Sequence, residues 1–222
     1  MTRFLATAVL ASALLLSASA AYAHSSGQLL SFQGLGDLQV VGDYYNGAGH
    51  SGTPNYRISF SSNFIGLRSV FHGGNGEYAL TPTNTPAIFV NGVTGSTVTG
   101  SMNVNRGFSG GLQFFYTAAF SETVTVWSGV DGTGTVLATM ALAANNANCT
   151  GAPSYCNWSS VGLDFSGTAK SVTFTGKADG MGISDITIGA DTTAVPEPST
   201  LCMLGTGLIG LSWNQLRRIL KR

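Results

Sequence analysis

Short apolar runs alternate with turns along the middle of the chain. The runs are rich in Val, Ile, Thr, Phe and Tyr, and clusters of Gly, Asn, Ser and Pro separate them. This spacing predicts strands, and hardly any stretch has the repeat of an amphipathic helix. The expected strands are 28–33, 38–45, 56–61, 67–72, 87–90, 96–104, 111–117, 123–128, 135–142, 159–165, 171–175 and 183–188. The pattern is typical of an all-β fold, an antiparallel β-sandwich of the jelly-roll kind.

The clearest alternation lies at 123–127, which reads Thr-Val-Thr-Val-Trp. Val124 and Val126 should therefore face the core while the threonines face solvent. The segment 131–134 reads Asp-Gly-Thr-Gly, which predicts a tight turn because glycine adopts positive φ at little cost. We expect 123–128 and 135–142 to pair antiparallel across this turn.

The first 23 residues have the features of a cleavable signal peptide. Arg3 precedes an apolar run, and the segment ends with Ala21 and Ala23 around a tyrosine. Small residues at these two positions predict cleavage before His24. The alternative is an uncleaved anchor, but the run is shorter than the roughly 20 residues of a spanning helix.

The last residues form a three-part tail. Pro196, Glu197 and Pro198 come first, an apolar stretch at 201–216 follows, and 217–222 carries four basic residues. The prolines keep the first part extended and accessible. The stretch 201–216 would span about 24 Å as a helix, a marginal transmembrane helix. Its basic end should stay cytoplasmic.

This order of features resembles the PEP-CTERM sorting signal of Gram-negative bacteria. The resemblance implies that an exosortase processes the chain near Pro196, Glu197 and Pro198. It also implies passage through the inner membrane, with the C-terminal helix as a temporary anchor, and delivery to the cell envelope, the cell surface or the extracellular matrix. A tail anchor behind a proline linker is the alternative. Ile219 and Leu220 dilute the compact arginine cluster that is usual for the signal.

Length and charge fit one exported domain between these ends. The expected organisation is a signal peptide at 1–23, a β-sandwich ectodomain at 24–190 and a sorting tail at 191–222, with the linker at 191–200. Between His24 and Val195 the chain has five basic and nine acidic residues, a net charge of −4. No basic stripe is present, which argues against nucleic acid as a partner. Segments 42–60, 115–142 and 162–189 also resemble an ectodomain that often precedes PEP-CTERM tails, which implies a β-sandwich without an assigned activity.

Two cysteines of the domain lie seven residues apart. Cys149 and Cys156 flank a short loop, and in an oxidising compartment this spacing predicts a disulfide worth about 2 to 3 kcal/mol. The alternative is a metal site with thiol ligands, but the domain has no further cysteines for it, since Cys202 belongs to the tail.

We expect no catalytic residues and no cofactor, with a structural calcium ion as the one metal to consider. Asp43, Asn46 and Asp185 are the candidate ligands, because calcium takes carboxylate and amide oxygens. The ordinary alternative is that these are turn and strand-edge residues. The three histidines do not form a zinc pattern.

Three functions remain open. A non-enzymatic surface protein that contacts exopolysaccharide is the first, with Tyr44, Tyr45, Tyr56 and Trp158 as aromatic side chains that could stack on sugars. A carbohydrate-active enzyme is the second, and it would need two carboxylates in a cleft; Glu77 and Glu122 are the only glutamates of the domain. An ice-binding protein is the third, suggested by Thr-x-Thr at 97–99, 123–125 and 173–175, although these motifs are not regularly spaced.

Overall fold

Strands make up nearly all regular structure of the domain. The computed structural model describes residues 27–47, 54–149 and 153–189, within the compact unit 25–193. The strands are β1 (Gln28–Leu30), β2 (Gln39–Val40), β3 (Ile58–Phe60), β4 (Phe64–Leu67), β5 (Ala87–Val90), β6 (Thr97–Ala118), β7 (Glu122–Trp127), β8 (Val136–Leu142), β9 (Ser159–Lys177) and β10 (Met181–Ile188). The single 3-10 turn in the described residues, η1 (Val70–His72), follows β4. No helix in these segments is long and apolar enough to cross a membrane.

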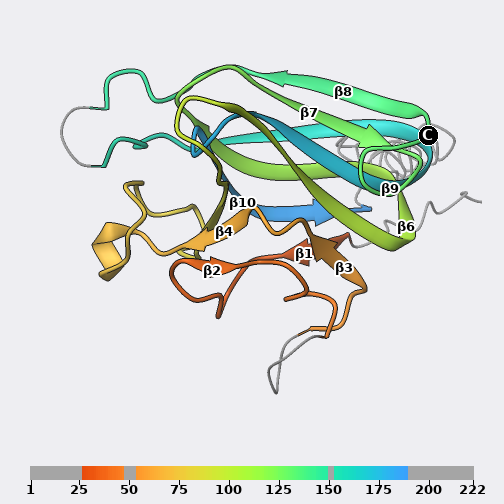
Figure 1. Cartoon of the computed structure of the whole chain (residues 1–222), viewed down its shortest axis with the longest axis horizontal. Coiled ribbons are helices and arrows are strands. Elements are labelled where there is room, and N and C mark those ends of the chain that lie inside the picture. The colour runs from red at the N-terminus through yellow and green to blue at the C-terminus, as the bar shows by residue number, and fades with distance from the viewer. Residues whose placement is uncertain (1–26, 48–53, 150–152, 190–222) are drawn as a thin grey trace, which may run out of the picture. The chain divides into compact units, whose positions relative to one another are not determined.

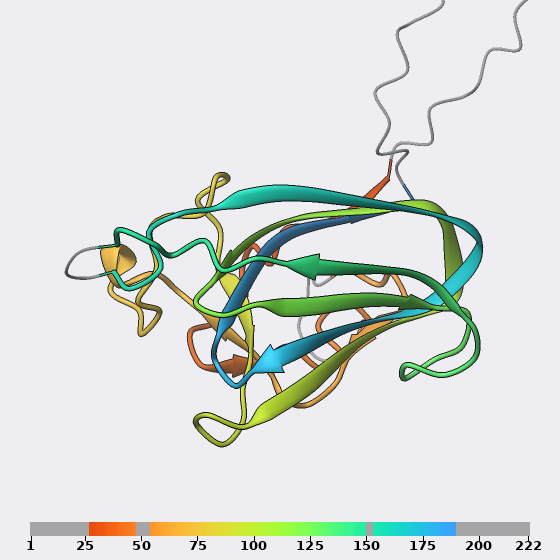
Figure 2. The same ribbon diagram turned by 90° about the horizontal axis from the view of Figure 1, so that it is seen from above.

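The ten strands form one continuous antiparallel sheet. Its order is β2-β4-β5-β10-β6-β9-β7-β8, with β1 beside β10 and β3 beside β6. The prediction of an all-β, antiparallel domain is confirmed. The long strands β6 and β9 curve together through the sheet in Figures 1 and 2.

Irregular pairing divides β6 and β9 into two arms. The ladder between them shifts register from Asn103 to Gly110. Before the shift β6 pairs with β3, and after it β6 pairs with β10. The strand β7 pairs only with the arm of β9 that begins at Ser171. Strands that the sequence predicts as separate pieces, at 96–104 and 111–117 and at 159–165 and 171–175, are therefore continuous. Local hydrophobicity drops at the shift, where Gly107 and Gly110 have positive φ, but β6 and β9 each continue through it as one strand.

The core lies between the two arms of the folded sheet. Phe64 on β4 meets Phe174 on β9 edge to face at 5.9 Å between ring centroids, and Phe174 meets Phe114 on β6 at 5.7 Å. All three side chains are fully buried. Gly100 on β6 makes room for this contact, because a Cβ there would lie 2.4 Å from a Phe64 ring carbon.

The hairpin of β7 and β8 confirms the clearest local prediction. Val124 and Val126 are completely buried, and β7 pairs antiparallel with β8. Asp131 and Gly132 both have positive φ in the turn. The alternation of the sequence thus sets which face of this strand enters the core.

The prediction of a strand at 67–72 is wrong. The strand β4 ends at Leu67, and η1 begins at Val70. Ser69 caps this turn by accepting a hydrogen bond from the Phe71 N–H, and Gly73 closes it with a φ of 70°. The capping serine and the glycine override the apolar run Val70-Phe71, which is exposed.

Candidate functional site

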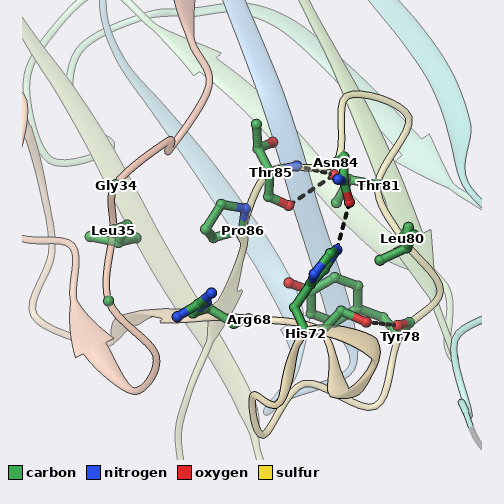
Figure 3. Close-up of a pocket in the computed structure, with 12 residues that line it drawn as sticks. Gly34, Leu35, Arg68, His72, Tyr78, Leu80, Thr81, Asn84, Thr85 and Pro86 are labelled. Carbon is green, nitrogen blue, oxygen red and sulfur yellow. Dashed lines mark hydrogen bonds between the residues drawn. The ribbon is translucent and has the colours of Figure 1, made fainter.

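A polar pocket opens where three connecting segments meet. The segments are 34–36 after β1, 68–72 after β4, and 78–86 before β5. The cavity measures about 380 Å³, within the range of small-molecule sites. Its lining consists of Gly34, Leu35, Gly36, Arg68, Ser69, His72, Tyr78, Leu80, Thr81, Asn84, Thr85 and Pro86, and Figure 3 shows most of these side chains.

Tyr78 forms the floor of the pocket. Its ring is buried among Ala87, Phe89 and Trp158 in a small second core. Its hydroxyl donates to the Leu67 carbonyl and accepts from the Ala87 N–H. Burial raises the pKa of Tyr78 to about 12. The hydroxyl is therefore neutral and committed to the backbone, and it fixes the spacing between β4 and β5.

A tight turn forms one rim. The Thr81 hydroxyl donates to the Thr85 carbonyl and accepts from the Thr85 N–H, both at 2.8 Å. Asn84 sits in this turn with a φ of 60°, and its Oδ1 lies 2.8 Å from His72 Nε2. An amide oxygen only accepts, so His72 Nε2 is the donor. The histidine of η1 thereby ties the rim to the other side of the pocket, as the dashed line in Figure 3 shows.

Arg68 is held at the pocket by its backbone. Its N–H donates to Asp37 Oδ1 at 2.7 Å, and the other oxygen of Asp37 accepts two bonds from Asn75. Burial acts to raise the pKa of Asp37, but these hydrogen bonds and the charge of Arg68 outweigh it and lower that pKa. The Arg68 guanidinium itself makes no hydrogen bond or ion pair within the described residues, so its five donors remain available.

A buried carboxylate lies behind the rim. Asp185 on β10 is 5% exposed and has a φ of 52°. Its Oδ2 accepts from the hydroxyls of Thr83 and Ser184, while its Oδ1 has no partner in the described part of the chain. Thr83 also lies 3.0 Å, oxygen to oxygen, from Thr85, which lines the pocket. A chain of hydroxyls thus leads from the pocket to the carboxylate.

The predicted calcium ligands fall into two environments. Asn46 donates from its amide to Asp43 at 3.1 Å, in an exposed turn, whereas Asp185 accepts from Thr83 and Ser184. No group of three His, Cys, Asp or Glu side chains that could hold a metal ion occurs in residues 27–47, 54–149 and 153–189. A calcium site that joins Asp43, Asn46 and Asp185 stays a prediction.

Cys149 and Cys156 form a disulfide in the structure, with their Cα atoms 5.5 Å apart. Tyr155, just before Cys156, is docked on the segment that leads to the pocket, since Ala79 N–H donates to the Tyr155 carbonyl at 2.7 Å. Tyr155 also packs edge to face on Phe89. The disulfide loop therefore supports the segment that carries Tyr78 and Leu80.

The aromatic side chains that could stack on sugars are committed to packing. Tyr45 is 3% exposed and stacks on Tyr56. Tyr44 donates its hydroxyl to the Gln33 carbonyl, and Trp158 donates its indole N–H to the Ala79 carbonyl. These four aromatic residues hold loops together and do not form an open aromatic platform.

The two domain glutamates also differ in their surroundings. Glu77 is exposed and accepts from the Ser154 hydroxyl at 3.0 Å. Glu122 is 2% exposed, and its carboxylate lies against the backbone of Gly176 and Gly180. Burial raises the pKa of Glu122 to about 7, although the hydrogen bond from the Lys177 N–H and the positive charge of Lys177 both act to lower it. Neither glutamate lines the pocket.

The three Thr-x-Thr motifs come together on the outer face of the sheet. Thr99 on β6 pairs with Thr175 on β9, which pairs with Thr123 on β7, and the hydroxyl oxygens of Thr99 and Thr175 are 2.9 Å apart. Their irregular spacing in sequence hides this register. A second row is Ser101, Thr173, Thr125 and Thr139.

The turn after β7 limits the extent of this threonine face. Gly132 N–H donates to the Ser171 hydroxyl at 3.0 Å, and Asp131 N–H donates to Asn103 Oδ1 at 2.8 Å. The turn thus lies across β9 toward β6 and leaves Thr173 only 7% exposed. The open part of the face is the row of Thr99, Thr175 and Thr123 with its neighbours on β7 and β8.

Two groups of predicted site residues lie outside the described residues. They are Ala21 and Ala23 at the signal cleavage site and Pro196, Glu197 and Pro198 in the tail, together with the expected C-terminal helix at 201–216. Conversely, sequence reasoning missed Arg68, Asn84 and the other pocket residues. The polar segment 81–86, Thr-Pro-Thr-Asn-Thr-Pro, was the available signal, because so rigid a turn between strands commonly builds a binding loop.

Comparison with known proteins identifies the tail. A family model described as the PEP-CTERM protein-sorting motif matches residues 194–218, which confirms the resemblance of this segment. The chain therefore carries a PEP-CTERM sorting motif at residues 194–218, and this motif implies export and sorting to the cell surface. No curated protein matches the chain.

Among solved structures, the domain is loosely similar to carbohydrate-binding modules. One is a point mutant of the family 29 module CBM29-2, with 13% identity, a TM-score of 0.41, and coverage of 78% of this chain and 99% of the module. Another family 29 module has 15% identity, a TM-score of 0.40 and coverage of 68% and 91%. A family 6 module has 14% identity, a TM-score of 0.36 and coverage of 74% and 95%. These TM-scores are too low to transfer a ligand or a site.

Proposed function

We propose that the protein is a non-enzymatic component of the cell surface or extracellular matrix, which an exosortase processes at its tail and whose domain contacts exopolysaccharide through the pocket around Arg68. The observation that carries the sorting part is the match of residues 194–218 to the sorting motif. The order of Pro-Glu-Pro, apolar stretch and basic end supports it, because it presents an accessible cut site at the outer face of the inner membrane.

Fractionation of cells tests the sorting part. Replacing Pro196, Glu197 and Pro198 by alanine should leave full-length protein in the inner membrane, whereas the wild type should be shortened and delivered to the surface. Deleting 201–222 should release the protein from the membrane. A surface-delivered, shortened alanine variant would show that the prolines are only a linker.

The proposal of glycan contact rests on the chemistry of the pocket. Arg68 and the Asn84 amide supply hydrogen-bond donors that suit sugar oxygens, and Leu35, Leu80 and Pro86 supply apolar walls. Leu80 is 44% exposed, so one wall is open to a chain that extends beyond the pocket. A glycan that enters here would meet His72 and Asn84 already held by their mutual hydrogen bond, so the Arg68 side chain is the main group that binding would have to order.

A glycan array on the purified protein tests this contact. Arg68→Ala and Asn84→Ala should each weaken binding to the glycans that the wild type retains. Arg106→Ala is the matched control, because Arg106 is exposed on β6 and does not line the pocket. Equal loss in all three variants would contradict the pocket as the binding site, and release of new reducing ends during incubation would favour the carbohydrate-active enzyme.

Ice binding is a second candidate, favoured by the register of the threonine motifs. Adjacent strands lie about 4.8 Å apart, so Thr99, Thr175 and Thr123 form a regular row of hydroxyl and methyl groups. Thermal hysteresis of the purified protein tests this function. Ice binding would be supported if Thr123→Lys abolishes the thermal hysteresis while Thr135→Lys, in the exposed turn, leaves it intact. Absence of hysteresis in the wild type would exclude it.

A further inference from the structure

We infer that the pocket selects acidic sugars, and that the Arg68 guanidinium recognises the carboxylate of a uronic acid residue. This inference rests on the proposed glycan contact and names its ligand class. Arg68 is the one permanently charged residue in the pocket lining, since the other polar lining side chains are His, Tyr, Ser, Thr and Asn. A planar guanidinium binds a carboxylate through two parallel hydrogen bonds.

The first support is that Arg68 is positioned without using its side chain. Asp37 accepts one bond from the Arg68 backbone and two from Asn75, so three donors already occupy its two oxygens. Within the described residues the guanidinium has neither an ion pair nor a hydrogen bond. The acid thus anchors the main chain of Arg68 and leaves the guanidinium available for a ligand.

The second support is the polarity around the guanidinium. His72 already occupies Asn84 Oδ1, so the free part of that amide is its NH₂ group, again a donor. In Figure 3 Arg68 lies between the 34–35 segment and His72, with Asn84 above the histidine. The pocket therefore offers donors from two sides, which suits a ligand rich in acceptors. A carboxylate has more acceptor capacity than the hydroxymethyl group of a neutral hexose.

The third support is the charge of the whole domain. The segment from His24 to Val195 has a net charge of −4, which repels a polyanion at long range. General electrostatic attraction cannot produce a preference for acidic glycans in such a protein. A measured preference would therefore have to come from a local cationic group, and Arg68 is the one Arg or Lys side chain that lines the pocket.

Isothermal titration calorimetry with oligogalacturonate and with the same oligomer reduced at its carboxyls tests the inference. The wild type should bind the acidic oligomer about ten- to a hundredfold more tightly, the size expected for a charge-assisted, bidentate contact. Arg68→Gln should bring the two affinities together. Arg68→Lys should lose most of the preference, because an ammonium cannot form the planar pair.

Arg106→Gln serves as the control and should keep the wild-type preference. The unfolding midpoints of all variants should nearly match, because the guanidinium of Arg68 makes no hydrogen bond or ion pair in the described residues and acts on Asp37 only through its charge. Equal affinity for the acidic and neutral oligomers would overturn the acid preference and leave glycan contact standing. No binding to either oligomer or to any glycan of the array would overturn both. Equal binding of a carboxylate-terminated tripeptide would show that the pocket takes carboxylates without selecting sugars, and would overturn the inference.

Discussion

Glu122 should make the stability of the domain fall as the pH rises through neutrality. Its carboxyl is buried at the start of β7, and Oε2 has no hydrogen-bond partner among the described residues. Burial raises the pKa from 4.5 to about 7 in the folded state. The protonated form is therefore the one that the fold prefers.

The sign and size follow from linkage. Below a pH of about 4.5 the carboxyl is protonated in both the folded and unfolded states, so Glu122 adds no pH dependence there. As the pH rises from 4.5 to 7, the unfolded chain releases the proton first, so the free energy of unfolding decreases. The difference of about 2.5 between the two pKa values corresponds to a loss of about 3 kcal/mol in the free energy of unfolding by pH 8. This is an upper value, because water that reaches the carboxylate reduces the loss.

Urea unfolding followed by tryptophan fluorescence between pH 5 and pH 8 measures this effect. In Glu122→Gln the neutral amide should remove most of the slope, so the variant should gain stability relative to the wild type as the pH rises. Glu77→Gln is the matched control, because Glu77 is exposed and should leave the slope unchanged. The neighbouring Lys177, Tyr155 and Asp179 remain in every variant. Equal slopes in wild type and Glu122→Gln would refute the reasoning.

Three further predictions concern the fold and its processing. Gly100→Ala should destabilise the domain by about 1 to 3 kcal/mol, since its Cβ would meet the Phe64 ring at 2.4 Å; a wild-type melting temperature would show that the ring moves aside. Replacing Cys149 and Cys156 by serine should cost about 2 to 3 kcal/mol and weaken glycan binding through the loop that supports the pocket; a non-reducing peptide map that finds both thiols free in the wild type would contradict the pairing. The mature N-terminus should be His24, and mass spectrometry that returns Met1 on secreted protein would contradict cleavage after Ala23.

Local sequence determined the sorting tail and the clearest hairpin. The three parts of the tail stand in a fixed order along the chain, so their identification needs no tertiary contact. The β7–β8 hairpin is equally local, because alternation sets the faces of Val124 and Val126 and glycines set the turn. Val70 and Phe71 have the hydrophobicity of a strand but form a 3-10 turn. Capping by Ser69 and Gly73 decides the backbone conformation there.

The candidate site could not be read from the sequence, because its groups meet only after folding. Arg68 follows β4, Asn84 belongs to the turn before β5, and Leu35 comes from the segment after β1. Each alone is an ordinary loop residue. Its place in a pocket depends on the order of strands in the sheet, which hydrophobic periodicity does not specify.

The threonine row shows the same division between sequence and structure most simply. The sequence determined that Thr99, Thr123 and Thr175 each face solvent, because each alternates with an apolar residue along its strand. Only the tertiary structure decided that they lie side by side. Strand pairing joins residues that are 76 positions apart in the case of Thr99 and Thr175, and register is set by the packing of the whole core around Phe114 and Phe174, not by the spacing of the motifs.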